Sequence, residues 1–483
     1  MIFEIHAEKM NEIGVDTAIF TYDNTSNILK NSEGEVFQYP DITKHNKIPS
    51  IPFDKNNPLK KSKSINLLKI QMGLSCNYSC DYCSQKFVER APETSKKDID
   101  AFMEKLNVLS FEEERGLQVE FWGGEPFVYW KTMKPLAEAM FDKFSSWKVK
   151  PIFSVITNGS ILTDEMIDWL MQYNFRISIS HDGPGQSVRG LDPFDDPEQK
   201  ERLLGLYRMM TNLKKGFSFN AMLNSKNRSR LAIYEWFVEL TGDENVKIGE
   251  GSIVDAYDED GISNSLITKK DHFDFRKQAF GELYQTDANI GFLGVLQKIG
   301  GFVQDVLSHT NSKYLGQKCG MDDIHTLAID LRGNIMTCQN VSSLETAPND
   351  ESHHGGNLDD YDNVSLKSST HWSNRKECGS CPVLHLCKGS CMFLDKKYWD
   401  ISCANAFSDN VVFFAAAIQN MTGYIPTIIK QADLPLDRQD IFGTIFEHKE
   451  DIRKKLSSIK VVSEISSNID EVEVYGKSYI KSI

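Results

Sequence analysis

The sequence lacks the features that mark membrane and exported proteins. Its longest apolar run, residues 411–418, is far too short to span a bilayer. The N-terminus places Glu4 and Glu8 where a signal peptide needs an apolar stretch. No internal repeat or low-complexity tract occurs either. We therefore expect a cytoplasmic protein with no membrane partner.

An excess of positive charge is also missing. The 483 residues include 54 Lys and Arg against 68 Asp and Glu, a net charge of −14, so we expect no nucleic-acid partner. A chain of this length, with 40% apolar residues, can bury a large core without disulfide staples. Because cytoplasmic conditions are reducing, the ten cysteines favour metal binding or catalysis.

The changes in composition along the chain predict five regions. They are a small β-containing region at 1–62, a partial barrel at 63–258, a helical bridge at 259–314, a loop-rich cysteine region at 315–421 and a helical tail at 422–483. Within the first region we predict strands at 17–22 and 35–39 and a linker at 44–63. This region is either a β cap on the main domain or a docking surface.

Alternating strand and helix patterns define the barrel region. The predicted strands are 67–72, 117–122, 151–157, 175–180, 217–223 and 246–254, and the helices between them are 95–109, 130–144, 163–172, 197–210 and 230–240. Such alternation is typical of parallel βα units. We therefore predict an α/β fold, a partial (β/α)6 TIM barrel whose functional residues lie at the carboxyl ends of the strands.

A first group of cysteines directly follows the first of these strands. Cys76, Cys80 and Cys83 lie on one short loop. Three thiolates hold three irons of a [4Fe–4S] cluster and leave the fourth iron open to another ligand. A structural zinc ion needs four ligands, and no histidine lies nearby, so iron is favoured over a zinc-binding interaction module.

This spacing resembles the radical SAM superfamily, in which the open iron binds S-adenosylmethionine (SAM) and a 5′-deoxyadenosyl radical is formed. The resemblance extends to further positions after the strands. It implies that Tyr82 contacts adenine, that Asn158 and Gly159 line the pocket, and that Arg189, or its rival Arg202, meets the SAM carboxylate. It assigns the amino group of SAM to Gly123, Gly124, Glu125 and Pro126, and the ribose to Ser180 and Asp182.

The remaining seven cysteines resemble the SPASM extension of peptide-modifying radical SAM enzymes, which carries two auxiliary iron–sulfur clusters. By position, the first auxiliary cluster would take Cys319, Cys338 and Cys391, and the second Cys378, Cys381, Cys387 and Cys403. The first set is one ligand short. The fourth ligand is His325, Asp322, Asp323 or the substrate, unless His325 is only structural. We do not expect His353 and His354 to bind metal.

The resemblance implies a peptide or protein substrate and an external electron donor such as a flavodoxin or ferredoxin. We expect oxidation of a ribosomally made peptide to a carbon–sulfur or carbon–carbon cross-link or another oxidised product, with Asp255 or Asp258 as the base. No cysteine is left as a hydrogen donor, which disfavours epimerisation. The alternatives are formylglycine formation on a sulfatase and, in another class, an iron–sulfur electron carrier. Residues 1–62 show no winged-helix pattern for binding a leader peptide.

Overall fold

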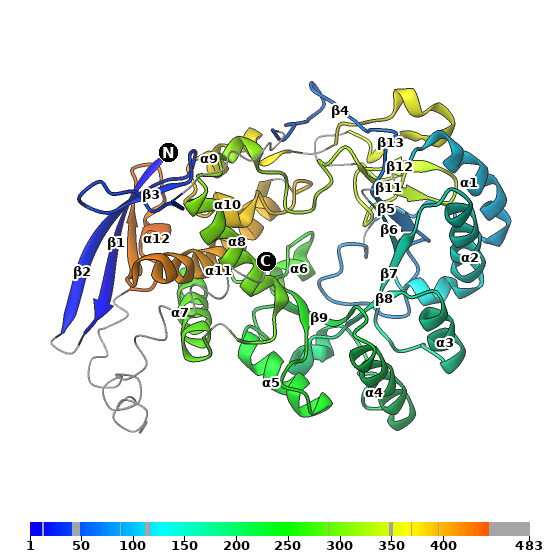
Figure 1. Cartoon of the computed structure of the whole chain (residues 1–483), viewed down its shortest axis with the longest axis horizontal. Coiled ribbons are helices and arrows are strands. Elements are labelled where there is room, and N and C mark those ends of the chain that lie inside the picture. Colours follow the sequence, from blue (N-terminus) through cyan, green and yellow to red (C-terminus); the bar gives the residue numbers. More distant parts are fainter. Residues whose placement is uncertain are drawn as a thin grey trace.

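A curved mixed sheet forms the centre of the molecule (Figure 1). The structure is a computed structural model that describes residues 1–11, 14–40, 49–86, 88–111, 116–287, 289–346, 351–368, 370–394 and 396–443. The strands of this sheet run in the order β10-β9-β8-β7-β6-β5-β11-β12-β13. Their bounds are β5 Leu67–Gln71, β6 Leu117–Trp122, β7 Pro151–Thr157, β8 Arg176–Ser180, β9 Phe217–Leu223, β10 Ile248–Ile253, β11 Thr326–Asp330, β12 Asn334–Met336 and β13 His354–Asn357.

The six strands from β5 to β10 are parallel and adjacent in chain order. Helices cover their outer face (Figure 1). Alternate residues of β9 are buried and those between them are partly exposed, as expected for a strand with one face packed against helices. The open parallel sheet confirms the predicted partial barrel. The helices are α1 Ile99–Lys105, α2 Trp130–Ser146, α3 Asp164–Gln172, α4 Pro197–Asn212 and α5 Arg230–Thr241.

The cysteine-rich region continues the barrel sheet. β11 pairs in parallel with β5, and β12 and β13 follow in antiparallel order. The side-chain amide of Gln71, at the end of β5, donates hydrogen bonds of 2.7 and 2.5 Å to the carbonyl oxygens of Gln339 and Val341. The loop after Cys338 is therefore tied to the strand that precedes the first cysteine group.

A separate antiparallel sheet, in the order β15-β1-β2-β3, contains the N-terminal strands. The strand predicted at 17–22 lies within β2, but the strand predicted at 35–39 was wrong, because only Val36 forms a bridge there. β1 and β15 were not predicted from the sequence, and β15 lies in the region predicted to be a helical tail. The bounds are β1 Ile2–Met10, β2 Val15–Asp23, β3 Ile28–Lys30 and β15 Ile425–Lys430.

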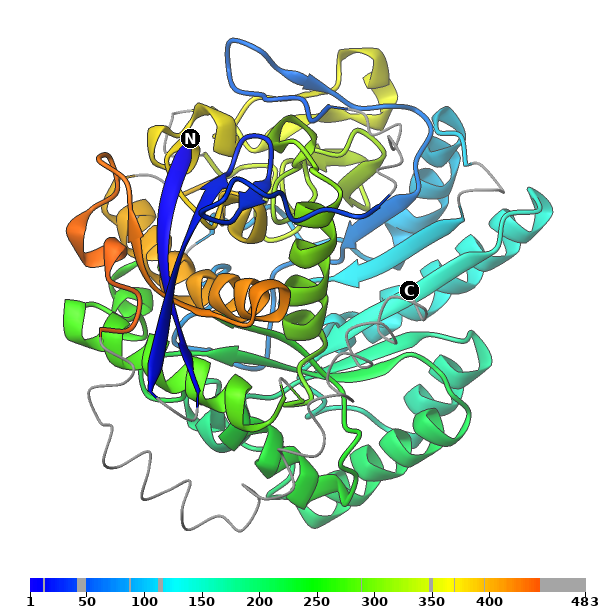
Figure 2. The ribbon, with the colours of Figure 1, turned by 60° about the vertical axis from the view of Figure 1, so that its left-hand side comes forward.

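The long helix α11, Lys396–Thr422, packs against α7, Lys269–Gln285, and α8, Leu293–Leu307. The N-terminal strands lie across it (Figure 2), and the rings of Tyr22 and Phe414 are 5.5 Å apart. α11 is long and apolar enough to cross a membrane, but 72% of its most apolar window is buried inside the protein. The shorter elements are α6 Glu259–Ser263, α9 Lys376–Gly379, α10 Leu384–Cys387, α12 Leu436–Gln439, and β4 Leu59–Lys60 paired with β14 Ser365–Leu366.

Candidate active site

A cavity of about 410 Å³ lies at the carboxyl ends of the parallel strands. The cysteine loop after β5 forms one wall. The lining includes most of the predicted site residues, namely Cys76, Cys80, Cys83, Tyr82, Gly123, Gly124, Glu125, Pro126, Asn158, Ser180, Arg189 and Asp255. Residues that the sequence places on separate loops are thus brought together around one space.

The turn after β6 packs directly against the cysteine loop. A Cβ atom on Gly124 would lie 2.4 Å from the carbonyl oxygen of Ser75, so only glycine permits this approach. The buried carboxylate of Glu125 accepts hydrogen bonds from the amide nitrogen of Asn158 and the hydroxyl of Thr157, both at 2.8 Å. Burial raises the pKa of Glu125 above its usual value. Glu125 therefore holds the ends of β6 and β7 together at the cavity wall.

Asp182 does not line the cavity, although the sequence analysis placed it in the ribose site. Its carboxylate is fully buried and accepts hydrogen bonds from the hydroxyl of Tyr82 at 2.5 Å and from Nη1 of Arg189 at 3.2 Å. It also accepts a 2.9 Å bond from the amide of Met222. Asp182 thus supports two cavity residues from behind. Arg202 lies elsewhere and pairs with Asp164 and Glu198.

The cavity's donor set fits an iron–sulfur cluster with a charged ligand. Three thiols share one wall, and burial is the main cause that raises the pKa of Cys80 to about 11, so a bound metal would have to displace its proton. Nε of Arg189 is buried and has no hydrogen-bond partner among the described residues. This guanidinium suits a carboxylate ligand. No group of three or more ligating side chains in the described ranges is spaced for a single metal ion.

The other seven cysteines fall into two electrostatic groups that match the predicted ligand sets. Burial is the main cause that raises the pKa of Cys378, and the nearby Cys387, Cys381 and Cys403 raise this pKa further. Burial likewise raises the pKa of Cys338 to about 12, with contributions from Cys319 and Cys391. The division into four and three cysteines is therefore compatible with two clusters, and the ligand assignment stays a prediction.

The three candidates for the missing ligand differ in position. Asp322 is buried, and it adds to the burial that raises the pKa of the Cys319 thiol. Asp323 accepts a 2.9 Å hydrogen bond from the backbone of His325, whose Nδ1 lies 2.7 Å from the carbonyl oxygen of Ser64. Asp322 is thus the best placed of the three. Of the two histidines that we do not expect to bind metal, His353 is buried and His354 is exposed.

The two residues predicted as the catalytic base, Asp255 and Asp258, lie in different surroundings. Asp255 lines the cavity and accepts a 3.3 Å hydrogen bond from the hydroxyl of Ser390. Asp258 is not among the lining residues, because it caps α6 by accepting a 2.6 Å bond from the amide of Gly261. Several lining residues were not predicted, among them Trp122, Asn220, Met222, Tyr257 and Asn340. Trp122 ends β6 and Met222 is the second-last residue of β9, and this strand-end position is a signal that could have found both.

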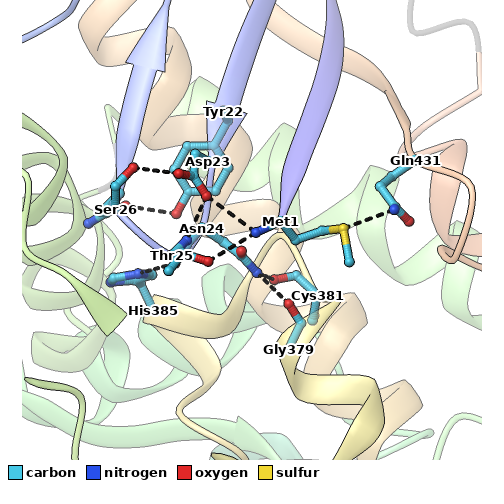
Figure 3. A network of polar contacts seen from close by, with 11 residues as sticks. Met1, Tyr22, Asp23, Asn24, Thr25, Ser26, Gly379, Cys381, His385 and Gln431 are labelled. Atoms are coloured by element: carbon cyan, nitrogen blue, oxygen red, sulfur yellow. Dashed lines mark hydrogen bonds and ion pairs between the residues drawn. The ribbon is translucent and has the colours of Figure 1, made fainter. Parts of the chain in front are cut away.

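The N-terminal sheet holds the loop that carries Cys381. The side-chain amide of Asn24 donates hydrogen bonds of 3.1 and 2.9 Å to the carbonyl oxygens of Gly379 and Cys381 (Figure 3). Nε2 of His385 lies 2.8 Å from the backbone oxygen of Asn24. These contacts support the interpretation of residues 1–62 as a cap on the main domain.

Residues 70–216 match the model of the Radical SAM superfamily, and this part of the chain is a radical SAM domain. The cofactors of this superfamily are a [4Fe–4S] cluster and SAM, as the sequence analysis expected. The chain is 21% identical over 402 residues to the radical SAM cyclopropyl synthase TigE of Paramaledivibacter caminithermalis, covering 77% of this chain and 76% of the relative. This relative therefore agrees with the radical SAM domain at residues 70–216.

The chain also resembles a cysteine-type anaerobic sulfatase-maturating enzyme of Clostridium perfringens. The two are 22% identical over 343 residues, which cover 65% of this chain and 85% of the relative. The solved structure of anSMEcpe with bound AdoMet superposes with a TM-score of 0.52 at 18% identity, over 74% of this chain and 96% of that one. This likeness shows the fold.

Proposed function

We propose that this protein oxidatively modifies a side chain of a peptide or protein substrate. The observation that carries the proposal is the extent of the cavity. It reaches from Cys76, Cys80 and Cys83 to Tyr257 and Asn340, which lie beside the later cysteines. An electron carrier needs no such space. A volume of about 410 Å³ lies in the range of sites that enclose a small molecule.

The lining residues have distinct tasks. When bound, the cluster and SAM supply a carbon radical that removes a hydrogen atom from the substrate. Cys76, Cys80 and Cys83 would hold the cluster, and Arg189 would orient the SAM carboxylate. The apolar side chains of Trp122, Met222 and Val254 exclude water from the reacting carbon.

Net oxidation also requires that a proton leave the substrate, and we assign that proton to Asp255. On one side Asp255 lines the main cavity. On the other it lines a second cavity of about 20 Å³, together with Lys298 and Lys318. That volume is enough for one water molecule, so the carboxylate has a polar outlet for the proton.

The favoured product is a new carbon–carbon or carbon–sulfur bond within the substrate. The relative named as a cyclopropyl synthase supports carbon–carbon bond formation. The sulfatase-maturating relative supports a second candidate, formylglycine formation. In both cases we propose two auxiliary clusters on the seven further cysteines and an external flavodoxin or ferredoxin as the electron donor.

Mass spectrometry distinguishes the two products. Anaerobically reconstituted enzyme is incubated with SAM, dithionite and, in separate reactions, a peptide encoded beside its gene and a sulfatase-motif peptide containing cysteine. A cross-link or ring removes two hydrogen atoms and keeps every heavy atom, whereas formylglycine formation from cysteine removes two hydrogen atoms and also replaces the sulfur by oxygen. Unchanged peptides despite 5′-deoxyadenosine formation would contradict the peptide substrate.

A further inference from the structure

Tyr257 joins the substrate cavity to the second cysteine region. It lies four residues after the end of β10, it lines the cavity, and its residue surface is 36% exposed. Its hydroxyl donates a 3.4 Å hydrogen bond to Sγ of Cys391. None of the seven later cysteines lines the cavity itself. The phenol of Tyr257 therefore connects the cavity to the sulfur atom of Cys391 through a hydrogen bond.

A second connection exists but uses only backbone. The amide nitrogen of Asn340, another lining residue, lies 3.4 Å from Sγ of Cys338. Cys338 and Cys391 belong to the same electrostatic group. The two contacts thus lead from the cavity to the same predicted cluster, and only the one from Tyr257 depends on a side chain that a substitution can remove.

A hydrogen bond to a ligating thiolate has a definite electronic effect. It withdraws negative charge from the sulfur, which favours the reduced state of an iron–sulfur cluster and raises its reduction potential. The oxidation proposed above removes one hydrogen atom, one electron and one proton from the substrate. The electron needs an acceptor near the cavity, and the sulfur bonded to Tyr257 lies on that side of the second cysteine region.

We propose that Tyr257 is a positioning residue for the electron-transfer step. Its hydroxyl bonds to Cys391 and raises the potential of the first auxiliary cluster, so that this cluster accepts the single electron lost by the substrate radical while Asp255 accepts the proton. The substrate is oxidised and the cluster is reduced by one electron. This inference rests on the proposed function.

The test compares Tyr257→Phe with wild type and with Tyr284→Phe. Tyr284 is 62% exposed and does not line the cavity, so it provides the same chemical change away from the site. Each protein is titrated anaerobically with redox monitoring by electron paramagnetic resonance, and iron and sulfide are counted. In Y257F we expect a more negative potential for one auxiliary cluster, and about a tenfold lower yield of oxidised peptide per 5′-deoxyadenosine. Y284F should match wild type.

The outcomes separate the inference from the function on which it rests. An unmodified peptide with the wild-type enzyme would contradict the proposed function. Normal modification by wild type, with no change of potential or of product yield in Y257F, would overturn only the role of Tyr257. Loss of iron from Y257F would overturn it too, because the phenol would then be needed to build the site. Tyr257→Leu, which also removes the ring, should reproduce the shift of Y257F.

Discussion

The hydroxyl of Tyr82 donates a 2.5 Å hydrogen bond to Oδ2 of Asp182. Tyr82 belongs to the cysteine loop after β5, and Asp182 follows β8, so this bond fixes the loop across the barrel mouth. Oδ1 of the same carboxylate bonds to Arg189. Asp182 itself does not face the cavity, but its charge orients Tyr82 and Arg189, which do.

Asp182→Asn should therefore weaken SAM binding without touching the ligand. The amide keeps one acceptor oxygen but cannot serve both Tyr82 and Arg189. Hydrogen bonds to a charged group contribute about 1.5–3 kcal/mol, so we expect an affinity loss of about tenfold or more. Equilibrium binding of SAM to the anaerobically reconstituted protein measures it.

A matched control exists in the same fold. Asp243 accepts a 2.5 Å hydrogen bond from the hydroxyl of Tyr207, and neither residue lines the cavity. Asp243→Asn should leave the SAM affinity unchanged. Wild-type affinity in D182N would show that Asp182 does not position the site.

Gly124→Ala should disrupt the cysteine loop. The added Cβ would lie 2.4 Å from the backbone oxygen of Ser75, next to Cys76, and backbone cannot move aside as a side chain can. We expect loss of the SAM-binding cluster, measured as about four fewer iron atoms per chain. In contrast, Gly205→Ala meets nothing within 4 Å inside α4 and should stabilise the protein by about 0.5–1 kcal/mol. Full iron content in G124A would contradict the close approach.

The buried ion pair between Arg230 and Asp409, at 2.5 Å, should dominate the stability of the junction between α5 and α11. Arg230→Met removes the ion-pair partner of Asp409 and leaves Lys298 as a positive neighbour, and we expect the free energy of unfolding to fall by about 3 kcal/mol. Urea titration at equal cluster content measures the change. Arg208→Met removes a pair with Glu201 that is exposed on both sides and should cost about 0–1 kcal/mol. Equal effects from the two variants would refute the difference.

His353 should make the fold sensitive to mild acid. Burial lowers its pKa from 6.5 to about 4. As pH falls below 6.5 the unfolded chain takes up a proton at this histidine before the folded one does, so stability decreases between about pH 6.5 and 4, by up to about 3 kcal/mol. Unfolding titrations across this range should show the full loss in wild type and in His354→Gln, whose site is exposed. In His353→Asn the loss should be smaller by this amount, because His272, whose pKa burial also lowers to about 4, still contributes. A pH profile in H353N identical to wild type would contradict the assignment.

The sequence predicted the barrel well because its local signals agree. β6, β7 and β9 coincide with predicted strands, and Thr163, at the predicted start of a helix, caps α3 by accepting a hydrogen bond from the amide of Met166. β1 and β15 were missed since their pairing joins residues 2–10 to 425–430, and neither segment announces a distant partner. Long-range pairing of this kind has no local signature.

In the candidate site, too, residues with a local sequence signal were predicted, and features that depend on the folded chain were not. The cysteines, Gly124 and Glu125 were predicted because their spacing is itself the chemical signal, and of these Cys76, Cys80, Cys83, Gly124 and Glu125 line the cavity. The direction of a side chain at a strand end was not predicted: Ser180 lines the cavity, whereas Asp182, two residues later, turns back into the core. Tyr257 carries no motif at all, and only the folded chain places it beside Cys391.

The central claim is that Cys76, Cys80 and Cys83 hold a cluster at which SAM is cleaved. The most direct measurement is 5′-deoxyadenosine formation by the reduced, anaerobically reconstituted enzyme, compared with a variant in which these three cysteines are alanine. We predict that wild type forms 5′-deoxyadenosine and methionine in equal amounts, and that the variant forms neither while it retains the iron of the auxiliary sites. A fully iron-loaded wild-type enzyme that leaves SAM intact, or a variant that cleaves it equally well, would contradict the account.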